Sequence, residues 1–207
     1  GVLKDPGAPG DWDRRGLVIG HVQSGKTANY IGLISKAADA GYRFVIVIAG
    51  IHNSLRKQTQ QRIDEGFVGR NGETKQRVGV GKLNRNRAFL VPLTNTASDF
   101  SKSYASGNTA DLEAYDRPVI LVIKKNVTTL GNVYSWLKQL NASQSDQISK
   151  IPMHLIDDEA DNASINTNKP DLDPTRTNAQ IRKLLKLFKK SCYVGYTATP
   201  FANIFIN

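Results

Sequence analysis

The feature that most constrains this chain is an eight-residue segment close to its first residue. Residues 20–27 read GHVQSGKT and match the pattern GxxxxGK[ST], with an apolar run before the segment and a helix-like run after it. Glycines let the backbone amides of such a loop turn toward phosphates, and the N-terminal end of the following helix adds positive potential. The segment therefore predicts a strand, a phosphate-binding loop and a helix in succession.

The residues of this loop have expected roles. Lys26 is expected to reach the β- and γ-phosphates of a nucleotide, and the Thr27 hydroxyl is expected to bind Mg²⁺. The nucleotide-binding set is completed by the loop positions Gly20, Gln23, Ser24 and Gly25. We assign no side-chain chemistry to the variable positions of the loop. A glycine turn that binds nothing is the alternative interpretation.

The rest of the chain alternates short β-branched runs with longer helical runs. This alternation is typical of an α/β fold with a mainly parallel sheet. The predicted strands cover residues 16–19, 44–49, 88–93, 118–123, 152–157 and 192–197. The predicted helices cover residues 26–40, 54–66, 127–140 and 179–190. Residues 66–87 and 162–178 predict loops because of their glycine, Asn, Thr and Pro content.

An acidic motif follows the fifth predicted strand, where residues 157–161 read DDEAD. A carboxylate at the end of a buried strand can hold the Mg²⁺ of a phosphate-loop site, and an adjacent glutamate can orient and polarise the attacking water. We assign these two roles to Asp158 and Glu159. Neighbouring strand residues point to opposite faces, so only one of Asp157 and Asp158 should face the metal. We choose Asp158 because it directly precedes the glutamate, and an acidic turn without function is the alternative.

Charge and composition narrow the class of partner. The chain has 28 Lys and Arg residues against 18 Asp and Glu residues, and a net charge of +10 favours polyanionic partners. No run of eighteen apolar residues occurs, so we expect no membrane-spanning helix. The single cysteine, Cys192, lies in an apolar run; we expect it in the core, and it fits a cytoplasmic location. His154, within a predicted strand, is also expected in the core. The only methionine is Met153, so we expect the chain to be a piece of a larger protein.

Three motifs together carry a resemblance to a known superfamily. The phosphate loop, the DEAD-type acidic motif and the segment TATP at residues 197–200 resemble superfamily 2 helicases and restriction-enzyme translocases. More narrowly, VQSGKT, IDDEADNASINT and GYTATPFAN resemble the bacterial helicase-like domain called Z-one, found in predicted endonucleases. The sequence departs from many helicases at Gln23 and Ser24, and no adenine-reading glutamine motif precedes the loop. The resemblance implies a RecA-like P-loop three-layer sandwich, with residues 1–207 as a single ATP-binding lobe and the second motor lobe absent.

The same resemblance implies residues that act on nucleic acid. Thr197 and Thr199, with Asp161, would couple hydrolysis to nucleic-acid movement. The segment NSLRKQTQQ at residues 53–61 is similar to one that grips a nucleic-acid strand, and KKN at residues 124–126 suggests a second contact loop. The candidate contact residues are Asn53, Ser54, Arg56, Lys57, Lys124 and Asn126. We also expect the basic loop 66–87 to be mobile or loosely packed without nucleic acid and to contact phosphates.

The expected function is a motor lobe of a DNA-dependent ATPase or translocase that binds ATP with Mg²⁺. Two alternatives stay open: a nucleotide-gated scaffold with negligible turnover, and a P-loop small-molecule kinase. The order of the strands separates the motor from the kinase. For the motor, the strand that ends at Thr197 should lie between the strands 16–19 and 152–157, whereas direct pairing of those two strands favours the kinase. The predicted motifs also each follow a predicted strand directly. In a parallel sheet, the loops that carry them would all lie at the carboxyl edge, where open α/β sheets bind ligands.

Overall fold

The structure is a computed structural model that describes residues 3–21, 25–83, 90–107, 112–141, 147–160 and 174–198. Within these ranges a six-stranded sheet has the order β1-β6-β5-β2-β4-β3, and every pairing in it is parallel. The strands are β1 (Trp12–Ile19), β2 (Phe44–Ala49), β3 (Val91–Pro92), β4 (Val119–Ile123), β5 (Met153–Asp158) and β6 (Lys190–Thr197). This sheet confirms the predicted α/β class.

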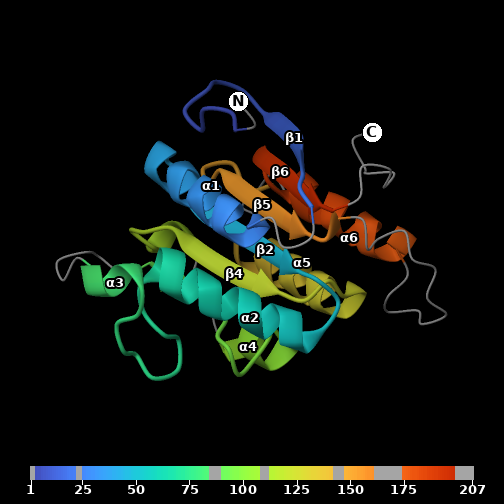
Figure 1. The fold of residues 1–207 in the computed structure, drawn as a ribbon. Coiled ribbons are helices and arrows are strands. Elements are labelled where there is room, and N and C mark those ends of the chain that lie inside the picture. The colour runs from blue at the N-terminus through green and yellow to red at the C-terminus, as the bar shows by residue number, and fades with distance from the viewer. Residues whose placement is uncertain are drawn as a thin grey trace.

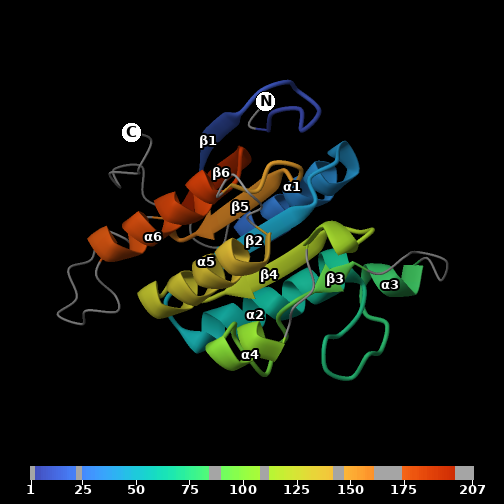
Figure 2. The same cartoon turned by 180° about the vertical axis from the view of Figure 1, so that it is seen from behind.

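Helices cover both faces of the sheet (Figures 1 and 2). On one face lie α1 (Lys26–Ala40) and α2 (Asn53–Ile63), and on the other lie α5 (Val127–Asn141) and α6 (Pro174–Leu187). Shorter elements are η1 (Asp64–Val68), α3 (Val80–Leu83), α4 (Lys102–Gly107) and η2 (Leu112–Ala114). The layers form the three-layer sandwich that the resemblance implies. None of the helices in the described ranges is long and apolar enough to cross a membrane.

Two hydrophobic cores hold the layers together because strand side chains alternate between the faces. Phe44 and Ile46 of β2 join the core under α5 and α6, whereas Val45 and Val47 join the core under α1 and α2. All six residues of β2 are buried, as expected for a central parallel strand covered on both faces. His154 and Cys192 are also fully buried, which confirms the core positions predicted for them.

The order of the strands agrees with the motor arrangement. Strand β6 lies between β1 and β5, and its last residue, Thr197, is in register with Ile19. On the other side, Tyr196 is in register with Asp158. The carboxyl ends of these three strands therefore meet at one edge of the sheet. Strands β1 and β5 do not show the direct pairing that would favour the kinase.

Several element boundaries differ from the prediction. Strand β1 begins at Trp12, four residues before the predicted start, because an edge strand tolerates the charged side chains that hid it in the sequence. Helix α6 covers 174–187 instead of 179–190, so that Pro174 opens the helix, where proline is favoured, and Lys190 starts β6. Of the predicted strand 88–93, only Val91–Pro92 is a strand, and residues 88–89 lie outside the described ranges. The predicted helix 54–66 begins at Asn53 and continues as η1.

The basic segment 66–87 is more ordered than predicted over its described part. After η1 ends at Val68, Arg70 and Arg77 form an antiparallel bridge, and α3 follows. Glycines permit this close packing: a Cβ atom added to Gly79 would clash with the Glu65 carbonyl oxygen, and one added to Gly81 would clash with the Gly69 carbonyl oxygen. The expectation of a loosely packed loop is therefore wrong for residues 66–83, and residues 84–87 lie outside the described ranges.

Candidate functional site

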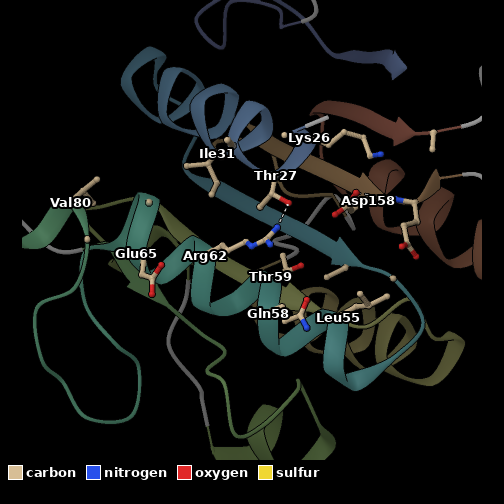
Figure 3. Close-up of a pocket in the computed structure, with 18 of the residues that line it drawn as sticks. Lys26, Thr27, Ile31, Leu55, Gln58, Thr59, Arg62, Glu65, Val80 and Asp158 are labelled. Carbon is tan, nitrogen blue, oxygen red and sulfur yellow. Dashed lines mark hydrogen bonds between the residues drawn. The ribbon is translucent and has the colours of Figure 1, made fainter. Parts of the chain in front are cut away.

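A pocket of about 1010 Å³ opens at the carboxyl edge of the sheet, between α1 and α2 (Figure 3). Its walls come from the loops that follow four parallel strands, from the start of α1 and one face of α2, and from η1 and α3. Among the lining residues are Gly25, Lys26 and Thr27 after β1, Gly50 after β2, Leu55, Gln58, Thr59 and Arg62 of α2, Asp158 and Glu159 at the end of β5, and Ala198 after β6. Gly25, Lys26 and Thr27 of the predicted phosphate loop and Asp158 and Glu159 of the acidic motif therefore share one pocket.

At one end of the pocket, Lys26 lies over the described part of the phosphate loop. Its Nζ donates hydrogen bonds to the carbonyl oxygens of Gly20 and His21, both at 3.2 Å. Gly25 adopts a left-handed conformation, φ 77°, directly before α1, which glycine does without steric cost. Charged phosphate oxygens are stronger acceptors than these neutral carbonyls, so an incoming phosphate could displace them. Gln23 and Ser24, two of the predicted binding residues, lie outside the described ranges.

Asp158 supplies the acidic wall of the pocket. Its Oδ2 accepts a hydrogen bond of 3.3 Å from the Tyr30 hydroxyl of α1, and its Oδ1 accepts one of 3.1 Å from the backbone N–H of Glu159. Burial raises the pKa of Asp158, and these hydrogen bonds and the charge of Lys26 oppose that rise. Thr27 and Asp158 thus bring a hydroxyl and a carboxylate to the same pocket, and hard oxygen ligands of this kind suit Mg²⁺.

Asp157 points away from the pocket, as strand alternation requires. Its Oδ1 lies 2.9 Å from the Nζ of Lys125, in an ion pair whose side chains are 2% and 3% exposed. Its Oδ2 accepts a hydrogen bond of 3.0 Å from the Tyr193 hydroxyl of β6. The structure therefore places Asp158, and not Asp157, in the pocket that Thr27 lines. Neither Lys125 nor Tyr193 was identified as a partner of the acidic motif from the sequence.

Lys125 also connects to the backbone of the glutamate next in the chain. Its Nζ donates a hydrogen bond of 3.0 Å to the carbonyl oxygen of Glu159, which has φ 57° in the left-handed region. The Glu159 carboxylate reaches the end of β2: a Cβ atom added to Gly50 would lie 3.0 Å from Glu159 Oε2. The backbone of Glu159 is thus held by a buried lysine from the loop after β4, and Gly50 leaves room for the Glu159 side chain.

Arg62 is a pocket residue that the sequence reasoning missed. Its guanidinium donates a hydrogen bond of 3.1 Å to the Thr27 hydroxyl, across the space between α2 and α1 (Figure 3). A signal for it was present: Leu55, Gln58 and Arg62 follow helical spacing and share one face of α2. The spacing alone does not identify these residues as pocket residues, because the sequence does not show that the helix borders the phosphate loop.

The candidate nucleic-acid contacts fall into two groups. Asn53, Ser54 and Lys57 are exposed around the first turns of α2, and Lys124 is half-exposed after β4. Arg56 is only 1% exposed. Its guanidinium donates hydrogen bonds to two backbone carbonyl oxygens, those of Asn95 at 2.9 Å and Thr96 at 3.0 Å. The burial of Arg56 argues against a direct contact between its side chain and a nucleic-acid strand.

Asn126 has a local structural task. Its Oδ1 accepts a hydrogen bond of 3.1 Å from the backbone N–H of Thr129, as the residue before the first turn of a helix commonly does. Lys125, the middle residue of the predicted contact loop 124–126, is buried in the ion pair with Asp157. Of this loop, Lys124 is the position that keeps a cation near the surface.

The residues expected to couple hydrolysis to movement are only partly described. Thr197 is fully buried at the end of β6, and its carbonyl oxygen accepts a hydrogen bond of 2.9 Å from the backbone N–H of Gly20. The start of the phosphate loop is therefore attached to the end of β6. Asp161 and Thr199 lie outside the described ranges.

Comparison with known proteins gives a family for this combination of fold and pocket. The model of the ResIII family, described as type III restriction enzyme, res subunit, matches residues 11–202. That span includes all six strands of the sheet and every residue that lines the pocket. Among curated proteins, none matches the chain.

Proposed function

The chain belongs to the ResIII family, the type III restriction enzyme res subunit, and from this premise we propose that it is a DNA-dependent ATPase motor. Its family membership makes the chain an ATP-binding motor lobe of helicase superfamily 2 type, and ATP hydrolysis is the activity of that family. The proposal adds that the lobe is DNA-dependent, that residues 1–207 form one RecA-like lobe, and that a second motor lobe completes the site.

The observation that carries the proposal is the meeting of Lys26, Thr27, Asp158 and Glu159 in one pocket. Lys26 would hold the β- and γ-phosphates of ATP, and Thr27 and Asp158 would hold Mg²⁺. When bound, Mg²⁺ neutralises charge that develops on the phosphates. Glu159 would orient the attacking water. Mg²⁺ is commonly bound by one or two protein oxygens together with substrate phosphates, and this pocket offers that kind of incomplete ligand set.

The DNA partner is inferred from charge and from the placement of α2. The net charge of +10 favours a polyanion. Helix α2 carries the pocket residue Arg62 near its end and three exposed candidate DNA contacts near its start, Asn53, Ser54 and Lys57. One helix therefore joins a candidate DNA-binding surface to the nucleotide pocket. This link favours a motor over a scaffold that only closes around ATP.

We also propose that the full-length protein is an endonuclease whose nuclease centre lies outside this lobe. The resemblance of the three motifs to the Z-one domain supports that association. In the part of the chain that the structure describes, no group of three or more His, Cys, Asp or Glu side chains could hold a metal ion. We therefore place the nuclease carboxylates outside the described part of this chain. We also propose that the protein is cytoplasmic.

ATP turnover by the full-length protein, with and without DNA, tests the proposal. We expect DNA to raise turnover, and we expect the isolated chain to bind ATP with very little turnover. An arginine from the second lobe is expected to stabilise the transferring phosphoryl group, and such arginines contribute roughly a thousandfold or more. Robust turnover by the isolated chain that Lys26→Ala abolishes would contradict the need for a second lobe. Negligible turnover by the full-length protein with DNA would favour the scaffold.

The surface cations near the carboxyl edge can be tested separately through salt dependence. If Lys57 and Lys124 contact phosphates, replacing each by alanine should weaken DNA binding regardless of sequence and reduce the salt slope by about one for each lost contact. Lys36→Ala is the matched control, because Lys36 is an exposed lysine of α1 that does not line the pocket. An unchanged slope in the double variant Lys57→Ala/Lys124→Ala would remove both residues from the proposed interface.

A further inference from the structure

The side chain of Arg62 lies in the nucleotide pocket, where its positive charge could act on a bound nucleotide in addition to those of Lys26 and Mg²⁺. Its guanidinium is 3.1 Å from the Thr27 hydroxyl, and both residues line the same pocket as Lys26 and Asp158. The contact joins two helices, α2 and α1, and points from α2 toward the start of α1 (Figure 3). Arg62 is exposed, so its charge remains hydrated and the side chain can change partners at little cost.

The present partner of Arg62 is weak for a guanidinium. A neutral hydroxyl accepts a single hydrogen bond here, whereas the planar fork of a guanidinium fits two oxygens of a phosphate or carboxylate. The hydrogen bond to Thr27 therefore uses only part of what the guanidinium fork can bind. A phosphate placed in this pocket would offer it a charged partner with several oxygens.

Binding of ATP with Mg²⁺ would also remove the present partner. The proposed function gives the Thr27 hydroxyl to Mg²⁺, and two cations that share one hydroxyl oxygen repel each other. The guanidinium would then leave Thr27 and need another acceptor. A phosphate held by Lys26 in the same pocket would offer one.

We propose that Arg62 binds the terminal phosphate of ATP and makes the pocket prefer ATP over ADP. The inference rests on the proposed function, since it requires a nucleotide in this pocket. It differs from the expected role of Lys26, which reaches both the β- and the γ-phosphate. Loss of Lys26 should weaken both nucleotides, whereas loss of Arg62 should weaken ATP selectively.

Equilibrium binding to this chain tests the proposal without any need for turnover. The probes are a non-hydrolysable ATP analogue and ADP, each with Mg²⁺, titrated against the original chain, Arg62→Ala and Arg62→Lys. We expect Arg62→Ala to weaken the ATP analogue about tenfold or more, as for loss of a charge-assisted hydrogen bond, and to change ADP affinity less than about twofold. Arg62→Lys should restore part of the loss, because lysine keeps the charge without the fork.

Arg182→Ala is the matched control, because Arg182 is an exposed arginine of α6 on the other face of the sheet. It removes the same charge and should leave both affinities unchanged. An equal loss of the analogue and of ADP in Arg62→Ala would overturn the proposal, and so would unchanged affinity. Tighter binding by Arg62→Ala would also overturn it, because Arg62 would then only block Thr27. If the original chain bound neither nucleotide, the proposed function itself would fail.

Discussion

Replacing Glu159 by glutamine in the full-length protein should lower ATP turnover roughly a hundredfold to ten-thousandfold while leaving ATP affinity within about twofold. A positioned proton acceptor contributes a factor of this size, and glutamine keeps the shape of the side chain but loses its basicity. Glu159 lines the pocket, and its carboxylate lies beside Gly50 at the end of β2. Single-turnover hydrolysis and equilibrium binding of ATP measure the two quantities separately.

Lys26→Ala is the informative comparison for Glu159→Gln. It removes a positive charge directed at the phosphates, so we expect weaker binding of ATP and lost turnover together. Glu159→Gln should instead bind ATP and retain it without hydrolysis. Equal loss of ATP affinity in the two variants would show that the division of roles between them is wrong.

The sequence was sufficient for those parts of the site that local order determines. The phosphate loop and the acidic motif are each continuous segments, and each follows a strand whose apolar character is plain in the sequence. The parallel sheet then brings Thr27 and Asp158 to one edge, because all parallel strands end there. Strand alternation allows only one of Asp157 and Asp158 to face the metal, and we choose Asp158 because it directly precedes the glutamate. The structure places Asp158 in the pocket and Asp157 in a buried ion pair.

The contacts that the sequence could not predict join residues far apart in the chain. Lys125 follows a strand and resembles a surface cation, yet it is buried against Asp157, 32 positions later in the sequence. Arg56 belongs to a polar helical segment, yet backbone carbonyl groups enclose it. The charge of a residue indicates that it needs a partner, but the packing of the helices and strands determines which partner it finds.

The glycines of residues 66–83 also show that composition alone does not predict how a segment packs. Glycine-rich, basic composition predicted a loosely packed loop, because such a segment has little apolar surface to bury. In the structure, Gly79 and Gly81 instead let backbone segments approach closely enough to exclude any side chain. Composition gives the conformational freedom of a glycine, and only the tertiary structure shows whether that freedom serves mobility or close packing.

Lys125→Met should destabilise the fold by about 3–5 kcal/mol, since it leaves the buried carboxylate of Asp157 without its counter-charge. The pair has an N–O distance of 2.9 Å and is almost completely shielded from water. For a domain of this size, the melting temperature should fall by roughly 6–20 °C. Urea unfolding gives the free energy, and thermal unfolding gives the temperature.

The exposed ion pair between Lys150 and Glu113, with an N–O distance of 3.0 Å, is the matched control for this variant. Lys150→Met removes the same charge from a solvated pair, so the free energy of unfolding should change by less than about 1 kcal/mol. A loss as large as that of Lys125→Met would mean that the charge, and not its burial, determines the effect.

A double-mutant cycle tests whether Lys125 stabilises the fold through its ion pair with Asp157. If it does, Lys125→Met/Asp157→Leu should be more stable than the sum of the two single losses implies, because no uncompensated charge stays buried. Tyr193 would lose its acceptor in the double variant, so we expect partial and not full recovery. Additive losses would show that the two residues stabilise the fold independently. In that case the main contribution of Lys125 to stability would come from its hydrogen bond to the Glu159 carbonyl oxygen. Lys125 would then act on the conformation of the proposed catalytic glutamate and not through the Asp157 carboxylate.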